Sequence, residues 1–192
     1  RMYAQKTIVT GFPMYYTDLN KYVLKKSNVR KVIGITQRVD YDKHTTILAE
    51  FAKRMIKKGW EVIQFMTDEK LYKEGNMFTK ILLNAGVTLG LNRTREAYYK
   101  RLKMCNTILG TGVEVLSTAG LEALYMGLNY VAVDNNSMRE GLDYRLLYHP
   151  YEFWEMEKLI EKPILNLVAR RFIAERYDYR NVMPKYAGMM LK

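Results

Sequence analysis

Two pairs of charged residues have the types and spacing to bind an anionic ligand that carries hydroxyl groups. Arg38 and Lys43 stand five positions apart, and a guanidinium and an ammonium in one loop can bind a diphosphate from one side. Glu114 and Glu122 have seven residues between them, and ionised carboxylates accept hydrogen bonds from sugar hydroxyls. Backbone amides for phosphate, in the turn between the two glutamates, together with two acids for hydroxyls favour a nucleotide sugar as the ligand, although each charged pair also has a simpler interpretation as solvated charge.

The two glutamates flank a stretch that predicts a turn leading into a helix. If Ser117 or Thr118 caps this helix, Glu122 lies near its first turn and Glu114 lies in the preceding loop. Free backbone N–H groups around Ser117, Thr118 and Ala119 can then receive a phosphate. A simpler interpretation is that Glu114 is solvated and that Glu122 only complements the helix dipole.

Composition limits the classes of protein that fit. The chain has 192 residues, 48% of them hydrophobic, which predicts one large domain with a sizeable core. Cys105 is the single cysteine, so a disulfide framework is excluded and a reducing, cytoplasmic location is expected. With two histidines, a Cys/His metal site is not expected, and no apolar run reaches membrane-spanning length. The net charge of +11 indicates an anionic partner, such as nucleic acid, anionic lipid or a phosphorylated ligand.

Hydrophobic periodicity predicts strands that alternate with helices. The expected strands span residues 6–10, 31–36, 61–66, 87–89, 107–109, 130–133 and 146–148. The expected helices span residues 18–26, 45–56, 76–85, 94–104, 117–126, 150–161, 163–176 and 184–191. The strands are short and apolar without alternation, as when both faces are covered, so the predicted fold class is α/β with a doubly wound, Rossmann-like parallel sheet. Ligands of such sheets bind at the carboxyl ends of the strands, where loops are expected at 37–44, 67–76, 90–94, 110–118 and 134–137.

The loop after the first central strand contains neither a dinucleotide-binding glycine motif nor a P-loop. Its residues 36–43, Thr-Gln-Arg-Val-Asp-Tyr-Asp-Lys, resemble instead the R-x-D-x-x-K loop of retaining glycosyltransferases of the GT-B type, which have two Rossmann-like domains. Glu114 and Glu122 resemble the E-x7-E element of that family. Residues 94–102 resemble the helix after its base-binding loop, and residues 174–179 resemble its closing helix.

The resemblance implies a role for each candidate residue. Arg38 and Lys43 would bind the donor diphosphate and stabilise it as it leaves, Glu114 would contact the donor sugar, and Glu122 would contact the ribose. Arg38, Lys43 and Glu114 would thus be the catalytic residues. Further contacts to the nucleotide sugar would come from Leu91, Asn92, Ser117, Thr118 and Ala119. No metal and no cofactor are implied, because two cations neutralise the diphosphate of the co-substrate.

The resemblance also implies how the chain is organised. Residues 1–30 would be a linker strand and short helix leading in from an N-terminal domain that is missing here, and residues 31–162 would be the domain that binds the nucleotide sugar. Residues 163–192 would be helices that pack back toward the missing domain. The chain would then be the C-terminal, donor-binding half of a hexosyltransferase-like enzyme, with a donor such as UDP-glucose, and would be incomplete because the missing domain or subunit carries the acceptor site.

The acceptor and the competing functions stay open. The basic charge permits DNA with hydroxymethylated bases as acceptor, as in phage-encoded relatives of the family, which would make the protein a DNA-modification enzyme. The alternative is a nucleic-acid-binding α/β module without catalysis, in which some of the sixteen tyrosines stack on bases. A lipid acceptor at a membrane surface is a third hypothesis, but no clear basic amphipathic helix supports it.

Overall fold

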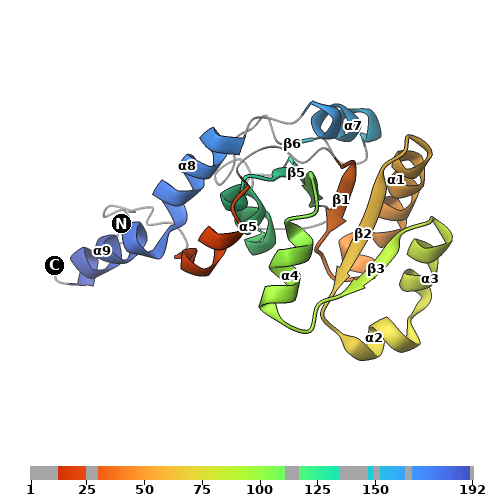
Figure 1. Cartoon of the computed structure of the whole chain (residues 1–192), viewed down its shortest axis with the longest axis horizontal. Coiled ribbons are helices and arrows are strands. Elements are labelled where there is room, and N and C mark those ends of the chain that lie inside the picture. Colours follow the sequence, from red (N-terminus) through yellow and green to blue (C-terminus); the bar gives the residue numbers. More distant parts are fainter. Residues whose placement is uncertain are drawn as a thin grey trace, which may run out of the picture.

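Six parallel strands form the central sheet of the computed structural model, which describes residues 13–24, 30–110, 117–134, 147–148, 152–162 and 166–190 (Figure 1). The strands run in the order β3-β2-β1-β4-β5-β6. Their bounds are β1 Val32–Ile35, β2 Glu61–Met66, β3 Thr88–Leu91, β4 Thr107–Leu109, β5 Asn129–Val133 and β6 Leu147–Tyr148. The direction of winding changes between β1 and β4, where ligands of such sheets bind. The predicted doubly wound α/β fold is confirmed.

Helices cover both faces of the sheet. Their bounds are α1 Thr45–Lys57, α2 Glu69–Glu74, α3 Met77–Asn84, α4 Arg95–Leu102, α5 Thr118–Met126, α7 Phe153–Glu161, α8 Asn166–Tyr177 and α9 Tyr179–Met190, with 3-10 turns η1 at Thr17–Tyr22 and η2 at Tyr41–Lys43. One apolar core joins the sheet to α1, α3 and α7, and the other joins it to η1, α4, α5 and α8. Successive side chains of a strand point alternately into the two cores. In β1, Val32 lies in the core on the α5 side and Ile33 lies in the core on the α1 side. Burial on both faces explains why these strands lack an alternating pattern.

Three local predictions were wrong. The loop expected at 67–76 contains α2, which begins where the Asp68 carboxylate accepts a hydrogen bond from the Leu71 N–H at 2.9 Å. The sequence predicts Thr45 as the cap of the helix expected at 45–56, but His44 precedes α1 with a φ of 51°, and Thr45 is the first helical residue. Pro184 does not begin the last helix but lies inside α9. The strand expected at 6–10 lies outside the described residues.

The segment before η1 joins the C-terminal helices to the domain. The backbone N–H of Met14 donates to the Tyr177 carbonyl at 2.6 Å, and the Tyr179 N–H donates to the Met14 carbonyl at 2.9 Å. Nearby, the rings of Tyr16 and Tyr125 stack with centroids 4.1 Å apart. These contacts anchor the junction between α8 and α9 to the domain. Figure 1 shows that the two helices extend away from the sheet.

A buried carboxylate joins α1 to α7 on the opposite face. Glu157 of α7 accepts a hydrogen bond from Lys58 at 2.8 Å and pairs with Arg54. Burial raises the pKa of Glu157, but the hydrogen bonds from Lys58 and Arg54 outweigh it and leave this pKa below its ordinary value.

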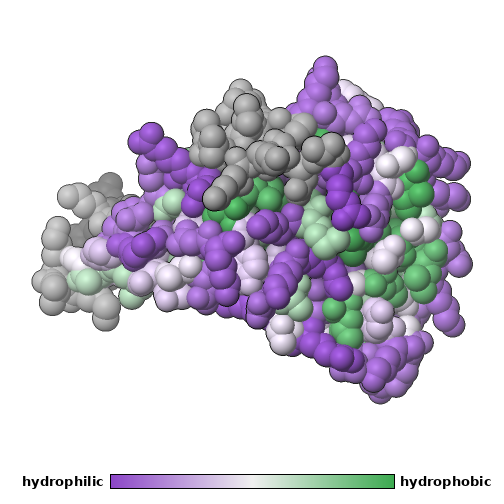
Figure 2. Space-filling view, in the orientation of Figure 1, coloured by the Kyte–Doolittle hydropathy of each residue, from purple (hydrophilic) through white to green (hydrophobic). Residues whose placement is uncertain are grey.

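The surface is largely hydrophilic over α2 and α8 in the view of Figure 2. Within these helices, Lys73 pairs with Glu69 and Arg171 pairs with Glu175, each at 2.8 Å. Cations of these helices are thus partly neutralised by acids one turn away. In the described part of the chain, no helix combines the length and apolar character needed to cross a bilayer.

Candidate functional site

A cavity of about 280 Å³ opens at the carboxyl ends of β1, β2 and β3. The loop after β1 contributes Arg38 and Asp40, the loop after β2 contributes Asp68, and the loop after β3 contributes Asn92. Tyr98 of α4 forms a further part of the wall. The cavity therefore lies at the edge of the sheet where the fold predicts a ligand.

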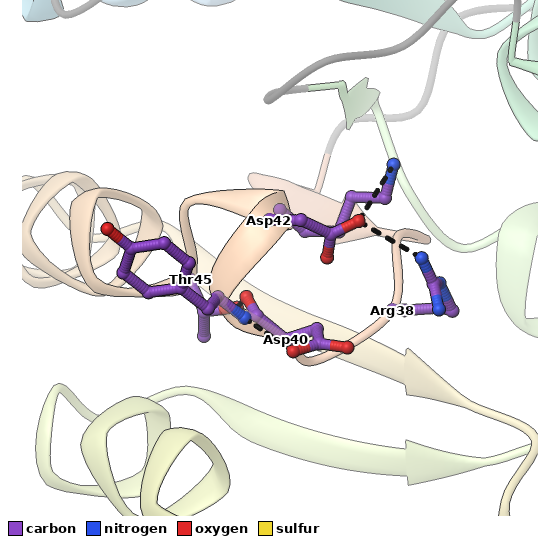
Figure 3. A network of polar contacts seen from close by, with 6 residues as sticks. Arg38, Asp40, Asp42 and Thr45 are labelled. Atoms are coloured by element: carbon purple, nitrogen blue, oxygen red, sulfur yellow. Dashed lines mark hydrogen bonds and ion pairs between the residues drawn. The ribbon is translucent and has the colours of Figure 1, made fainter.

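Arg38 and Lys43 converge on a single carboxylate. The Arg38 Nη2 atom lies 3.1 Å from Oδ2 of Asp42, and the Lys43 Nζ atom lies 3.9 Å from the same oxygen (Figure 3). The Arg38 side chain is 72% exposed, whereas that of Lys43 is 14% exposed. The structure thus brings the two predicted cations together, and it places an exposed carboxylate between them.

The same loop is attached to the start of α1. The Asp40 N–H donates to Oγ1 of Thr45 at 3.2 Å, and the Thr45 hydroxyl donates back to the Asp40 carbonyl at 2.7 Å (Figure 3). The Asp40 carboxylate accepts the N–H of Tyr41 at 2.7 Å and so caps η2. These bonds attach the backbone between Arg38 and Lys43 to the start of α1.

Ser117, one of the two residues that the sequence offered as a cap, is the N-cap of α5. Its hydroxyl accepts the Gly120 N–H at 3.2 Å, and Gly127 ends the helix with a φ of 90°. Thr118 is exposed and Ala119 is partly exposed at the first turn, where backbone N–H groups lack helical acceptors. A Cβ atom at Gly120 would overlap the ring of Tyr130, so this position needs glycine.

Glu122 lies inward from this turn and is engaged by α4. Its Oε1 atom accepts hydrogen bonds from Arg95 Nη2 at 3.0 Å and from the Tyr99 hydroxyl at 2.9 Å. Arg95 Nε donates in turn to the Tyr99 oxygen, and the Arg95 guanidinium lies over the Tyr99 ring. The Glu122 side chain is 9% exposed, so its charge is largely removed from solvent.

The Glu122 charge affects the tyrosines around it. Burial, with the Glu122 carboxylate as the next cause, raises the pKa of Tyr16, Tyr98 and Tyr99. The hydrogen bonds to Glu122 and Tyr99 raise the pKa of Arg95. The three phenols therefore stay neutral and Arg95 stays charged at neutral pH, so Arg95 is the cation that offsets Glu122 in this cluster.

Leu91 ends β3 and Asn92 follows it at the cavity, but both are used within the protein. The Arg101 guanidinium donates to the Leu91 carbonyl at 2.9 Å and to Oδ1 of Asn92 at 2.8 Å. The Asn92 amide donates to the Gly90 carbonyl at 3.2 Å. Asn92 lines the cavity, and these bonds show that its side chain shapes the loop.

The candidate site differs from the sequence prediction in its composition. Glu114 lies outside the described residues, so its predicted pairing with Glu122 stays a prediction. Arg95, Tyr98 and Tyr99 were not predicted as site residues, although their i, i+3 and i+4 spacing places them on one face of α4. Among the described residues, no cluster of three His, Cys, Asp or Glu side chains is arranged to hold a metal.

Solved structures share this arrangement of strands and helices. No protein-family model matches the sequence, and no curated protein matches it. Anabaena HepE, in complex with UDP and glucose, superposes with a TM-score of 0.69 at 16% identity over 85% of this chain and 48% of its own. Staphylococcus aureus TarM, in a complex that contains UDP, gives a TM-score of 0.70 at 17% identity over 87% of this chain and 36% of its own. The chain has the Rossmann-like α/β fold found in part of these GT-B glycosyltransferase structures.

A glycosyltransferase from Rickettsia africae has the same fold with still lower sequence similarity. It gives a TM-score of 0.73 at 10% identity over 95% of this chain and 56% of its own. The present chain thus spans between about a third and just over half of these solved chains. At such sequence identities the similarity establishes the fold alone, so any proposal of function has to be argued from the residues of the site.

Proposed function

We propose that this chain is the donor-binding half of a retaining, hexosyltransferase-like enzyme that uses a nucleotide-diphosphate sugar. The observation that carries the proposal is the convergence of Arg38 and Lys43 on one oxygen of Asp42 beside the strand-end cavity. Two cations held at one point by a fixed loop match the charge of a diphosphate. HepE and TarM, which share the fold, have been solved with UDP, and HepE also with UDP-glucose.

The present partner of the two cations is easily displaced. The Asp42 side chain is exposed, and exposed ion pairs contribute only about 0–1 kcal/mol. A diphosphate brings more negative charge and more acceptor oxygens than one carboxylate, so it can replace Asp42 at Arg38 and Lys43. In sugar transfer the same contacts stabilise the charge on the leaving diphosphate.

The other candidate residues complete the proposed site. The free N–H groups of Thr118 and Ala119, next to the Ser117 cap, add donors for phosphate at the start of α5. Glu122 accepts a ribose hydroxyl, Leu91 and Asn92 border the base, and Glu114 contacts the donor sugar. Residues 31–162 form the donor domain, and residues 1–30 and 163–192 connect it to an acceptor domain or subunit outside this chain.

The acceptor is a separate proposal. The net charge of +11 supports an anionic acceptor, and we propose that the acceptor is DNA with hydroxymethylated bases. We propose that the reaction takes place in the cytoplasm. The alternative, a nucleic-acid-binding module without catalysis, rests on the same charge. Salt-dependent DNA binding without any nucleotide-diphosphate binding would favour the alternative.

A panel of nucleoside diphosphates tests the main proposal. The midpoint of thermal unfolding is measured with UDP, GDP, ADP and dTDP, and uridine serves as the control without phosphate. Since a ligand that binds the native state stabilises it by mass action, about 2.7 kcal/mol is expected at a hundredfold excess over the dissociation constant. We expect one of the four diphosphates to raise the midpoint of unfolding most, and we expect uridine to raise it little. No shift with any of the four diphosphates would overturn the proposal.

A further inference from the structure

A buried side-chain amide joins the loop after β1 to β2. Gln64 is 1% exposed, and its Nε2 atom donates to the Gln37 carbonyl at 2.7 Å and to the Phe65 carbonyl at 3.0 Å. Gln37 and Phe65 both line the strand-end cavity. The amide therefore connects two segments of the cavity wall, one that follows β1 and one that belongs to β2.

This bond continues the connection between β1 and β2 beyond the point where the strand pairing ends. The last paired residues are Ile35 and Gln64, and Gln37 lies two positions further along the loop. The neighbours of Gln64 on β2, Ile63 and Phe65, are buried and apolar. Burying an amide among them costs free energy unless the amide is hydrogen-bonded. The carbonyl of Gln37 is thus the reason that a polar side chain is accommodated here.

Arg38 lies between two buried neighbours in the chain. Gln37, whose carbonyl Gln64 holds, is 5% exposed, and Val39 is 7% exposed and packs into the core on the α1 side. The Arg38 side chain between them is 72% exposed. The backbone of Arg38 is therefore placed by contacts that its two neighbours make with the body of the domain.

We infer that Gln64 is a positioning residue for the Arg38 guanidinium. By holding the carbonyl of the preceding residue, it places the backbone from which Arg38 reaches the diphosphate. The inference rests on the proposed function and adds a residue that does not itself touch the ligand. Lys43, at the other end of the loop, is attached separately through the bonds between Asp40 and Thr45. Gln64 should therefore act on the contribution of Arg38 and not on that of Lys43.

The competing interpretation is that the Gln64 amide only stabilises the fold, and Asn129 supplies a matched control for it. Asn129 is also 1% exposed, and its Nδ2 atom donates to the Leu159 carbonyl at 3.1 Å. It begins β5, so it lies at the edge of the sheet opposite the strand-end cavity. Asn129→Leu therefore removes a buried bond from an amide to a carbonyl, as Gln64→Met does, without touching the cavity wall.

The test is the ratio of UDP affinity to UMP affinity, measured by calorimetric titration of the full chain. Gln64→Met keeps the side-chain volume and removes the donor, and it should reduce the ratio about three- to fivefold, the share expected of an exposed guanidinium. Gln64→Asn, whose amide is too short to reach the Gln37 carbonyl, should act in the same direction. Asn129→Leu should leave the ratio unchanged. A general loss of stability would affect both ligands alike and would not move the ratio.

A double-mutant cycle identifies the group through which Gln64 acts. In an Arg38→Ala background, Gln64→Met should change the ratio by less than about twofold, because the guanidinium that it positions is gone. In a Lys43→Ala background, Gln64→Met should keep its full effect, because the two residues act at different ends of the loop.

Three results would overturn the inference. They are an unchanged ratio in Gln64→Met, an equal reduction of the ratio in Asn129→Leu, and an effect of Gln64→Met that is as large without Arg38 as with it. Each would leave UDP binding by the wild type intact and would spare the proposed function. Failure of the wild type to bind any nucleoside diphosphate would overturn both.

Discussion

Alanine at Lys43 should weaken nucleotide-diphosphate binding more than alanine at Arg38, because the two cations differ in burial. The Lys43 side chain is 14% exposed, so its contact with phosphate should approach the full value of a charge-assisted hydrogen bond, about 1.5–3 kcal/mol. This corresponds to a loss of about 10- to 150-fold in affinity. The Arg38 side chain is 72% exposed, so solvent screening should limit its contribution to about 1 kcal/mol, or about fivefold.

The assay is calorimetric titration of UDP and of UMP into wild type, Lys43→Ala and Arg38→Ala. The monophosphate should lose much less affinity than the diphosphate in both variants, because both cations are assigned to the diphosphate. Raising the salt from about 0.15 M to about 0.5 M should reduce the Arg38 effect more than the Lys43 effect. Lys53→Ala, which removes an exposed lysine of α1, controls for net charge. Equal losses for UDP and UMP, or a larger loss for Arg38→Ala, would refute the reasoning.

Three further predictions concern the carboxylates and the start of α5. Glu122→Gln should weaken UDP and UDP-glucose by similar amounts, about 1–2 kcal/mol, whereas Glu114→Gln should selectively weaken the sugar conjugate; calorimetry of both ligands distinguishes them. Gly120→Ala should lower the free energy of unfolding by about 1–3 kcal/mol through overpacking, whereas Gly188→Ala, which meets open space in α9, should be neutral or stabilising in denaturant titrations. Because the pKa of Glu157 is lowered in the folded state, its contribution to stability is present above its unfolded pKa of about 4.5 and is lost as the pH falls through the folded value. Glu157→Gln should therefore be less stable than wild type at neutral pH and lose less stability on acidification, as followed by thermal unfolding; an unchanged acid profile would contradict this assignment.

The sequence predicted those elements whose ends carry their own chemical signals. The strand at Glu61–Met66 has the expected bounds, and α5 runs from its Ser117 cap to Gly127 as predicted. α2 was missed because six residues carry too little periodicity to distinguish a helix from a loop, although Asp68 is a helix-capping residue type. Capping and period are local properties, and the sequence displays them directly.

The candidate site was predicted less completely because it depends on contacts between distant segments. The pairing of Arg95 with Glu122 joins residues 27 positions apart, and no local pattern indicates it. The attraction of Arg38 to Asp42, by contrast, spans four positions and follows from the loop sequence. Asn92 was assigned to the ligand, and its bond to Arg101 shows that it also organises its own loop. Residue types thus indicated the chemistry, whereas the tertiary structure decided which partner each group meets.

A crystal structure of this chain with UDP-glucose tests the central claim most directly. The account predicts the nucleotide in the cavity at the carboxyl ends of β1, β2 and β3, with its diphosphate between Lys43 and the start of α5. A ribose hydroxyl should lie within hydrogen-bond distance of the Glu122 carboxylate, and Arg38 should have moved from Asp42 to the diphosphate. A nucleotide bound elsewhere, or a diphosphate that contacts neither Arg38 nor Lys43, would contradict the account.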